Sequence, residues 1–193
     1  MHHGGWVFGY GSLMWAPEFP VAEQVIAQAD GWRRSFCLRS IQHRGTAEAP
    51  GLVLGLEAQP GHLCTGLALR VEAPLWPEVH AALRARELVT EAYREALVPL
   101  ELADGRRVEA LTYVMRPEHW QYCGGLGIEE QARIIASAHG GRGPNAEYLF
   151  NTAAHLDELG IPDDDIAALA AQVRALTAQR GSMSASGSGN AAR

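Results

Sequence analysis

The chain of 193 residues contains 47% hydrophobic and 20% charged residues, and its formal net charge is -6. This composition suits one globular domain with its own core, and it excludes a chain that is disordered over most of its length. The negative charge excludes nucleic acid as the main partner, because phosphate binding needs a basic surface. All 16 basic residues are arginine, which excludes chemistry that depends on lysine, such as a Walker-type phosphate loop or a pyridoxal Schiff base.

The cysteines and the absence of long apolar segments indicate where the protein works. Cys37, Cys64 and Cys123 are odd in number and irregular in spacing, which is typical of reduced thiols. The N-terminal residues lack the basic and apolar regions of a secretory signal, and no stretch approaches the roughly 18 apolar residues of a membrane span. We therefore expect a cytoplasmic protein without a membrane partner.

The first half of the chain has the patterns of short strands separated by turns. Val25 to Ala29 is interpreted as one helical turn, Gln42 to Gly51 as a loop, and Pro60-Gly61 as a turn between two strands. The predicted strands are Trp6–Tyr10, Gly31–Ser40, Gly51–Leu56 and Cys64–Val71.

The second half begins with a helix and a hairpin and then becomes helical. Apolar residues at helical spacing predict a helix from Pro74 to about Leu88, and Asp104-Gly105 predicts a hairpin between two strands. These two strands and the later helices are predicted at Tyr93–Leu102, Val108–Met115, Ile128–Ala138, Asn145–Leu159 and Asp163–Ala178.

Early strands joined by hairpin links and followed by helices predict an α+β fold around a mostly antiparallel sheet or partial barrel. We expect a single domain over residues 6–178. The Ser- and Gly-rich segment 181–193 is predicted to be a disordered tail.

Several common site types are missing from the sequence. Gly9 and Gly11 resemble the start of a dinucleotide fingerprint, but Met14 occupies the position of the third glycine. Ser12 lacks the flanking glycines of a nucleophile elbow. The histidines form no i, i+4 pair in a helix and there is no Cys-x-x-Cys, so we expect neither a metal nor a cofactor. Cys123 is interpreted as a small loop residue or, alternatively, as a reactive thiol.

A glycine-rich turn and one glutamate remain as candidates for the site. Consecutive N–H groups in the turn from Phe8 to Leu13 can hold an anion, although an ordinary tight turn has the same sequence. Glu87 lies near the end of the predicted helix, where the helix dipole raises the pKa of a carboxyl group. A raised pKa suits a general base, and an exposed charge at a helix end is the alternative.

Several motifs occur in the chain in the order of a known family, over roughly residues 6–178. These motifs are Val7–Trp15, His43–Thr46, Pro50-Gly51, Arg86-Glu87 with Tyr93, Asn145–Thr152 and His155–Ile161. On these motifs the sequence resembles the ChaC family of glutathione-specific γ-glutamylcyclotransferases.

This resemblance implies a γ-glutamylcyclotransferase-like fold, a mixed sheet or barrel flanked by helices with a helical C-terminal region. It implies glutathione as the substrate, which is cleaved to 5-oxoproline and cysteinylglycine, and Glu87 as the catalytic acid and base. It also implies that the substrate is bound by a run of residues in the glycine-rich turn. These are Val7, Phe8, Gly9, Tyr10, Gly11 and Ser12.

The sequence departs from the family pattern at Gln42, where an acid is usual, at Leu52, where arginine is common, and at Glu91-Ala92, where Gly-Gly is common. Arg44 is a candidate for contact with the glycine carboxylate of glutathione or, alternatively, an arginine that stabilises its loop. Two other functions stay open. One is a cyclotransferase for other γ-glutamyl compounds, and the other is a non-catalytic binding or regulatory protein linked to cation transport.

Overall fold

The computed structural model describes residues 4–186, and these divide into two compact units. The first unit contains residues 4–38 and 54–124, and the second contains residues 39–53 and 125–186. The expectation of a single domain over residues 6–178 stays a prediction. Each unit is described separately below.

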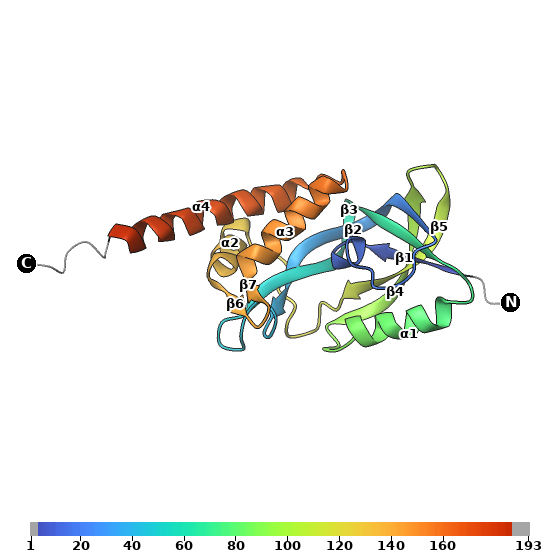
Figure 1. Ribbon diagram of the computed structural model, residues 1–193, viewed down its shortest axis with the longest axis horizontal. Helices are drawn as coiled ribbons and strands as arrows, with labels where there is room; N and C mark the ends of the chain where they lie inside the picture. The colour runs from blue at the N-terminus through green and yellow to red at the C-terminus, as the bar shows by residue number, and fades with distance from the viewer. Residues whose placement is uncertain (1–3, 187–193) are drawn as a thin grey trace, which may run out of the picture. The chain divides into compact units, whose positions relative to one another are not determined.

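The first unit is built on a closed barrel with the strand order β1-β3-β2-β4-β5 (Figure 1). β1 pairs antiparallel with β3 and parallel with β5, whereas β4 pairs antiparallel with both β2 and β5. The expected mixed, mostly antiparallel sheet is therefore confirmed, and the barrel is closed rather than partial. The strands are β1 (Gly5–Gly9), β2 (Glu23–Ser40), β3 (Gly51–Val71), β4 (Tyr93–Leu102) and β5 (Arg107–Met115).

β1 is a buried strand because both of its edges are paired and its side chains are apolar. Its register with β3 runs from Gly5 opposite Val71 to Gly9 opposite Leu67. A side chain at Gly66 would collide with the carbonyl oxygen of Gly9, so glycine at this position lets the two backbones approach. The end of β1 is thereby fixed against β3, and the chain leaves the barrel at Tyr10.

Apolar side chains from the strands fill the barrel. Phe8 and Leu56 are fully buried, and small residues such as Ala68 and Ala110 make room for the larger side chains. The whole cluster consists of Phe8, Ala27, Ala29, Leu56, Cys64, Ala68, Val98, Leu100, Leu102, Ala110 and Val114.

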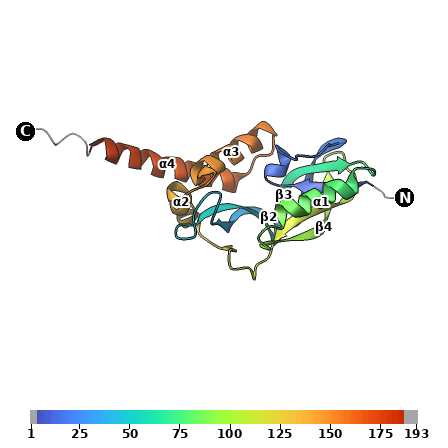
Figure 2. The ribbon, with the colours of Figure 1, turned by 60° about the horizontal axis from the view of Figure 1, so that its bottom comes forward.

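The expected helix after β3 is confirmed as α1 (Trp76–Glu87), which lies beside β4 in both views (Figures 1 and 2). Val79 and Leu83 are its buried residues, as their spacing of one helical turn predicts. The polar side chain of His80 reaches Glu95 of β4, with 2.8 Å between Nε2 and Oε1. α1 is therefore held along the barrel, and its last residue is Glu87.

Two predictions, a helical turn and a turn between strands, were wrong because both segments lie inside the long strands β2 and β3. Val25 to Ala29 is not a helical turn but part of β2. Its residues alternate between exposed and buried positions, which is the period of a strand, and the two alanines fit inside the barrel. The turn at Pro60-Gly61 does not end a strand either, because β3 continues through it, with Gly61 at a φ of 81°.

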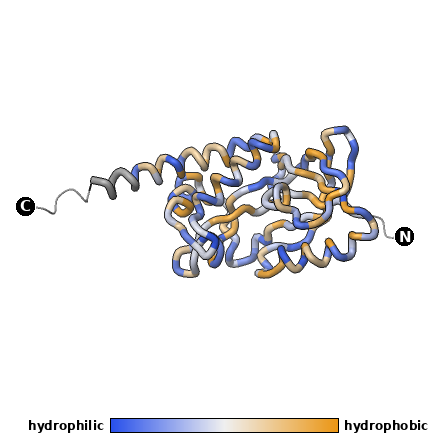
Figure 3. Tube along the Cα trace, in the orientation of Figure 1, coloured by the Kyte–Doolittle hydropathy of each residue, from blue (hydrophilic) through white to orange (hydrophobic). Residues whose placement is uncertain are grey.

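The predicted hairpin between β4 and β5 is confirmed, with Gly105 at a φ of 86° in its turn. Such a backbone conformation favours glycine because other residues clash there. Asp104 accepts hydrogen bonds from the Arg106 backbone and guanidinium, which closes the turn. The hairpin tip is hydrophilic, in contrast to the strands that it joins (Figure 3).

The second unit consists mainly of the predicted helices, in which α4 packs along α2 and α3 (Figure 1). A two-residue strand pair that the sequence did not suggest lies between α2 and α3. α4 continues past Ala178, so residues 181–186 of the expected tail are helical, and residues 187–193 lie outside the described residues. The elements are α2 (Ile128–Ser137), β6 (His139–Gly140), β7 (Gly143–Pro144), α3 (Asn145–Glu158) and α4 (Asp164–Ser186).

Asn145 fixes the start of α3 to the beginning of β3. Its Oδ1 accepts a hydrogen bond of 2.6 Å from the Leu52 N–H, and its Nδ2 donates one of 2.7 Å to the Leu52 carbonyl. Both residues are fully buried. Leu52, one of the expected departures from the family pattern, is therefore a core residue of the second unit.

The helices give no sign of a membrane segment. Among residues 4–186, none of the helices combines the length and the apolar character that are needed to cross a bilayer.

We predict that Asn145→Ala lowers the free energy of unfolding by about 2–4 kcal/mol, because two buried backbone groups of Leu52 lose their partners. The measurement is chemical denaturation of both proteins. Asn151→Ala, at an exposed position of the same helix, is the matched control and should change stability by less than about 0.5 kcal/mol. Equal effects of the two substitutions would contradict this role of Asn145.

Candidate active site

The predicted glycine-rich turn lies directly after β1 and leads into a short 3-10 helix, η1 (Ser12–Met14). The N–H of Met14 donates to the Gly11 carbonyl at 2.9 Å, and the N–H of Ala16 donates to the Ser12 carbonyl at 2.8 Å. The side chains of Val7 and Phe8 are fully buried in the barrel unit. Of the residues expected to bind substrate, Val7 and Phe8 therefore hold the turn in place. Gly9 and Gly11 after them are also buried, whereas Tyr10 and Ser12 are partly exposed.

Tyr10 anchors this turn to the barrel through its side chain. Its hydroxyl donates a hydrogen bond of 2.9 Å to the carbonyl of Tyr113 in β5. A Cβ at Gly9 would be tightly placed, 3.2 Å from Cγ of Met14 and 3.3 Å from the Met14 nitrogen. The turn is thus packed tightly on one side, which restricts its conformation.

Arg86 links this turn to the end of α1. Its Nη2 donates to Ser12 Oγ at 2.9 Å and its Nη1 donates to the Ala16 carbonyl at 2.9 Å. Its Nε lies 3.2 Å from Oε1 of Glu87, and its Nη1 lies 3.3 Å from Oε2 of Glu18. One guanidinium therefore brings together the predicted substrate-binding turn and the predicted catalytic carboxyl group. This role of Arg86 was not predicted, and the only signal for it in the sequence is its place beside Glu87.

Glu87 is the last residue of α1, and only 21% of its side chain is exposed. Burial raises the pKa of its carboxyl group, the neighbouring Arg86 lowers the pKa, and Glu18 raises it, with a net increase. The direction agrees with the sequence-based expectation. The main cause is different, because desolvation rather than the helix dipole dominates.

Other acidic residues near Glu87 are in different surroundings. Glu95 contacts His80 and Arg84 of α1 and accepts a hydrogen bond of 3.2 Å from the Tyr113 hydroxyl. Burial and then the charges of Glu95 and Glu87 raise the pKa of Tyr113. Tyr113 is therefore close enough to Glu87 to sense its charge, and it stays protonated at neutral pH.

The departure from the family pattern at Glu91 has a backbone consequence. Glu91 has a φ of 56°, in the left-handed region that favours glycine, and Ala92 after it is fully buried. The conformation of this segment thus fits the Gly-Gly that the resemblance led us to expect. Glu91 is exposed and contributes no buried charge near Glu87.

The predicted loop from Gln42 to Gly51 is confirmed as irregular and belongs to the second unit. Its carbonyl groups at Gln42 and His43 accept hydrogen bonds of 2.8 and 2.9 Å from Gly141 and Arg142. Arg44 lies over the ring of Tyr148 at 5.4 Å, and its Nη1 donates to the Pro144 carbonyl at 3.2 Å. These contacts support the interpretation that Arg44 stabilises the loop, and a contact with substrate stays a prediction.

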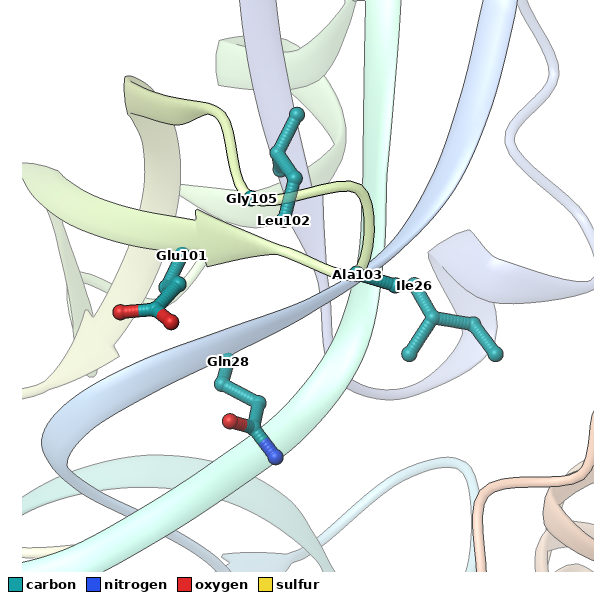
Figure 4. A pocket seen from close by; sticks show the side chains of 6 residues that line it. All are labelled: Ile26, Gln28, Glu101, Leu102, Ala103 and Gly105. Atoms are coloured by element: carbon teal, nitrogen blue, oxygen red, sulfur yellow. The ribbon is translucent and has the colours of Figure 1, made fainter.

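Possible metal clusters and one further pocket are the alternatives to the candidate site. In the described part of the chain, no cluster of three or more His, Cys, Asp or Glu side chains could hold a metal ion. A pocket beside the β4–β5 hairpin is lined by none of the predicted site residues (Figure 4). Its lining residues are Ile26, Gln28, Glu101, Leu102, Ala103 and Gly105.

The three cysteines are free and buried. Burial raises the pKa of Cys37 to about 12, so its reactive thiolate is scarce at neutral pH. Cys123 is only 8% exposed, which favours the interpretation as a small residue over that as a reactive thiol.

Comparisons with known proteins agree with the fold and the motifs. The model of the family described as ChaC-like protein matches residues 5–176. The glutathione-specific γ-glutamylcyclotransferase of Escherichia coli (strain K12) is 38% identical over 174 residues, covering 90% of this chain and 74% of that protein. γ-Glutamylcyclotransferase 2-3 of Arabidopsis thaliana is 33% identical over 175 residues, covering 88% of each chain.

A solved structure supports the architecture independently. The crystal structure of a γ-glutamylcyclotransferase specific to glutathione from yeast has a TM-score of 0.79 with this model. The match covers 89% of this chain and 96% of that chain. At 23% sequence identity, this likeness shows the fold. The expected γ-glutamylcyclotransferase-like fold is thereby confirmed.

We predict that Arg86→Met raises the pKa of Glu87 further, because the substitution removes the positive charge that opposes desolvation. The pKa is measured by NMR titration of the Glu87 side-chain carboxyl. Arg84→Met is the matched control, since Arg84 lies on the same helix but pairs with Glu95. A lower pKa of Glu87 in the Arg86 variant would contradict the assigned electrostatics.

Proposed function

Because the chain belongs to the ChaC family, we propose that it cleaves glutathione to 5-oxoproline and cysteinylglycine, with Glu87 as the general base and acid. The observation that carries the proposal is a half-buried carboxyl group with a raised pKa, joined through Arg86 to the glycine-rich turn after β1. The names of the relatives indicate the substrate class. The contacts of Arg86 with Ser12 and Glu87 support the choice of the turn and of Glu87 as the site.

The reaction needs no nucleophile from the protein. The α-amine of the γ-glutamyl group attacks its own γ-carbonyl carbon, a C–N bond forms, and the bond to the cysteinyl nitrogen breaks. Bending the substrate into this arrangement exploits the effective molarity of ring closure, on the order of 10^5 M or more. A site that binds and orients the substrate and relays the protons released by the attacking nitrogen is sufficient.

Glu87 can perform both proton transfers. In its ionised form it accepts a proton from the α-ammonium, which frees the amine for attack. The same carboxyl group then gives this proton to the departing cysteinyl nitrogen. The attacking nitrogen loses a second proton as it becomes the lactam nitrogen, and the released amine or the solvent takes up that proton. A raised pKa favours this exchange, since a base works best when its pKa approaches the working pH.

The turn from Gly9 to Ser12 is the proposed binding element for the negative charges of the substrate. Backbone N–H groups are well suited to a carboxylate or a developing oxyanion, since they donate hydrogen bonds without reorganising during the reaction. The contacts of Tyr10 with Tyr113 and of Ser12 with Arg86 support such a rigid arrangement.

We also propose that the protein works in the cytoplasm. Its three cysteines are free, as expected for a reducing compartment, and reduced glutathione as the substrate fits the same compartment. Fractionation of the source cells, followed by detection of the protein with an antibody, tests this assignment.

The proposed role of Glu87 predicts that Glu87→Gln reduces turnover by about 10^2- to 10^4-fold, because an amide cannot accept the ammonium proton. Cysteinylglycine released from glutathione by the purified protein is the measurement. In the wild type, kcat/KM should fall as the pH drops through the raised pKa of Glu87, since the protonated carboxyl is not a base.

Glu91→Gln is the matched control for this experiment, because Glu91 is an exposed acid close in sequence. It should retain most of the activity. A Glu87→Gln variant that keeps its fold and more than about a tenth of wild-type turnover would exclude Glu87 as the base.

Selectivity for glutathione over other γ-glutamyl compounds is the second expected property. Every γ-glutamyl substrate presents the same glutamyl end, so discrimination must come from the cysteinylglycine half. Binding energy from that half can also bend the glutamyl group towards ring closure, so a shorter substrate should lose kcat as well as affinity. We expect kcat/KM for glutathione to exceed that for γ-glutamyl-alanine by at least about tenfold.

The two substrates are compared with the same protein preparation and pH. Equal values, or a preference for the dipeptide, would assign the protein to cyclotransferases for other γ-glutamyl compounds. Binding of glutathione without any cysteinylglycine release would instead favour a non-catalytic protein.

A further inference from the structure

Arg34 of β2 places a guanidinium in the interior of the first unit, directly behind the glycine-rich turn. The residue is 4% exposed. Its Nη1 donates a hydrogen bond of 2.7 Å to the Tyr10 carbonyl, and its Nη2 donates one of 3.1 Å to the Thr65 carbonyl of β3. Burying a charged guanidinium costs free energy even when it is hydrogen-bonded. An arginine at this buried position therefore suggests a function for its bond to the Tyr10 carbonyl.

The bond from Arg34 sets the direction of the next N–H group in the turn. The carbonyl of Tyr10 and the N–H of Gly11 belong to one planar peptide group, and the described residues contain no cis peptide bond. In a trans peptide the carbonyl and the N–H point in opposite directions. Because the carbonyl points towards Arg34, the N–H of Gly11 points away from the guanidinium.

The N–H of Gly11 is a buried donor without a backbone acceptor. Gly11 is buried, and a Cβ there would meet only Cδ1 of Leu54, at 3.4 Å. Among the residues that the structure describes, no backbone carbonyl accepts the Gly11 N–H. The next residue, Ser12, is the one bound by Arg86 beside Glu87. A buried N–H normally has a hydrogen-bond partner, so the Gly11 N–H is a candidate donor to a ligand next to the proposed base.

We infer that Arg34 is a positioning residue that aims the Gly11 N–H at the α-carboxylate of the γ-glutamyl group. This inference rests on the proposed function. The anchored Tyr10 hydroxyl and the Met14 hydrogen bond to the Gly11 carbonyl fix the two ends of the same segment, and Arg34 fixes its middle. Arg34 does not touch the substrate, and it acts through the peptide group.

Arginine suits this role better than lysine for two reasons. Its planar fork donates to carbonyls of two different chain segments at once, whereas an ammonium lacks that fixed geometry. Its charge is permanent, and in a buried site of low dielectric constant it also attracts an anion held on the other side of the peptide.

The test compares glutathione with an analogue in which the γ-glutamyl α-carboxylate is replaced by a carboxamide. Both substrates retain the attacking amine and both release cysteinylglycine. For Arg34→Met we expect kcat/KM to fall by about 10- to 100-fold on glutathione and by less than about threefold on the amide. Arg34→Lys, which keeps the charge but loses the fork, should lie between the wild type and Arg34→Met. Arg33→Met, at the neighbouring position of β2, is the matched control and should behave as the wild type.

A second measurement does not depend on turnover. 5-Oxoproline carries the same carboxylate, so titrating it should shift the Gly11 amide resonance in the wild type and much less in Arg34→Lys. The positioning role would be overturned by an equal loss of kcat/KM on both substrates. It would also be overturned if 5-oxoproline shifted the Gly11 resonance as much in Arg34→Lys as in the wild type. If the wild type released no cysteinylglycine from glutathione, the proposed function would fail, while the titration would still decide the role of Arg34.

Discussion

The guanidinium of Arg86 is the contact on which the candidate site depends. The turn after β1 and the end of α1 are far apart in the sequence, and each is fixed to the barrel by its own packing. Arg86 adds direct bonds to Ser12 and Ala16 on one side and to Glu87 on the other. It also opposes the effect of burial on the pKa of Glu87. One side chain therefore contributes both to the position of the carboxyl group and to its pKa.

The parts of the fold that local sequence determines were predictable. The spacing of apolar residues predicted α1 and the helices of the second unit, and Asp104-Gly105 predicted the hairpin. Both patterns reflect contacts between residues that are close in the chain. Val25 to Ala29 was interpreted wrongly, since its alanines suit a helix as well as the inside of a barrel. Only the pairing of β2 with β4, through Ala27 opposite Leu102, decides between the two.

The candidate site shows the same division between local and distant contacts. The turn and Glu87 were found from their motifs, and Arg86 belongs to the same motif as Glu87, but no role was predicted for the side chain of Arg86 or of Arg34. Their roles arise from bonds to Tyr10, Thr65 and Ser12, which no local pattern encodes. The cause of the raised pKa of Glu87 was missed for a similar reason, because burial is a property of the folded unit rather than of a helix end.

The buried cysteines have a consequence for a protein proposed to work on a thiol peptide. Glutathione disulfide modifies proteins through attack by an accessible thiolate, and the rate depends on how much thiolate is present. Cys37, Cys64 and Cys123 are all buried, and the pKa of Cys37 is raised to about 12. We therefore expect S-glutathionylation of these three thiols in the folded protein to be slow, because none of them is an accessible thiolate.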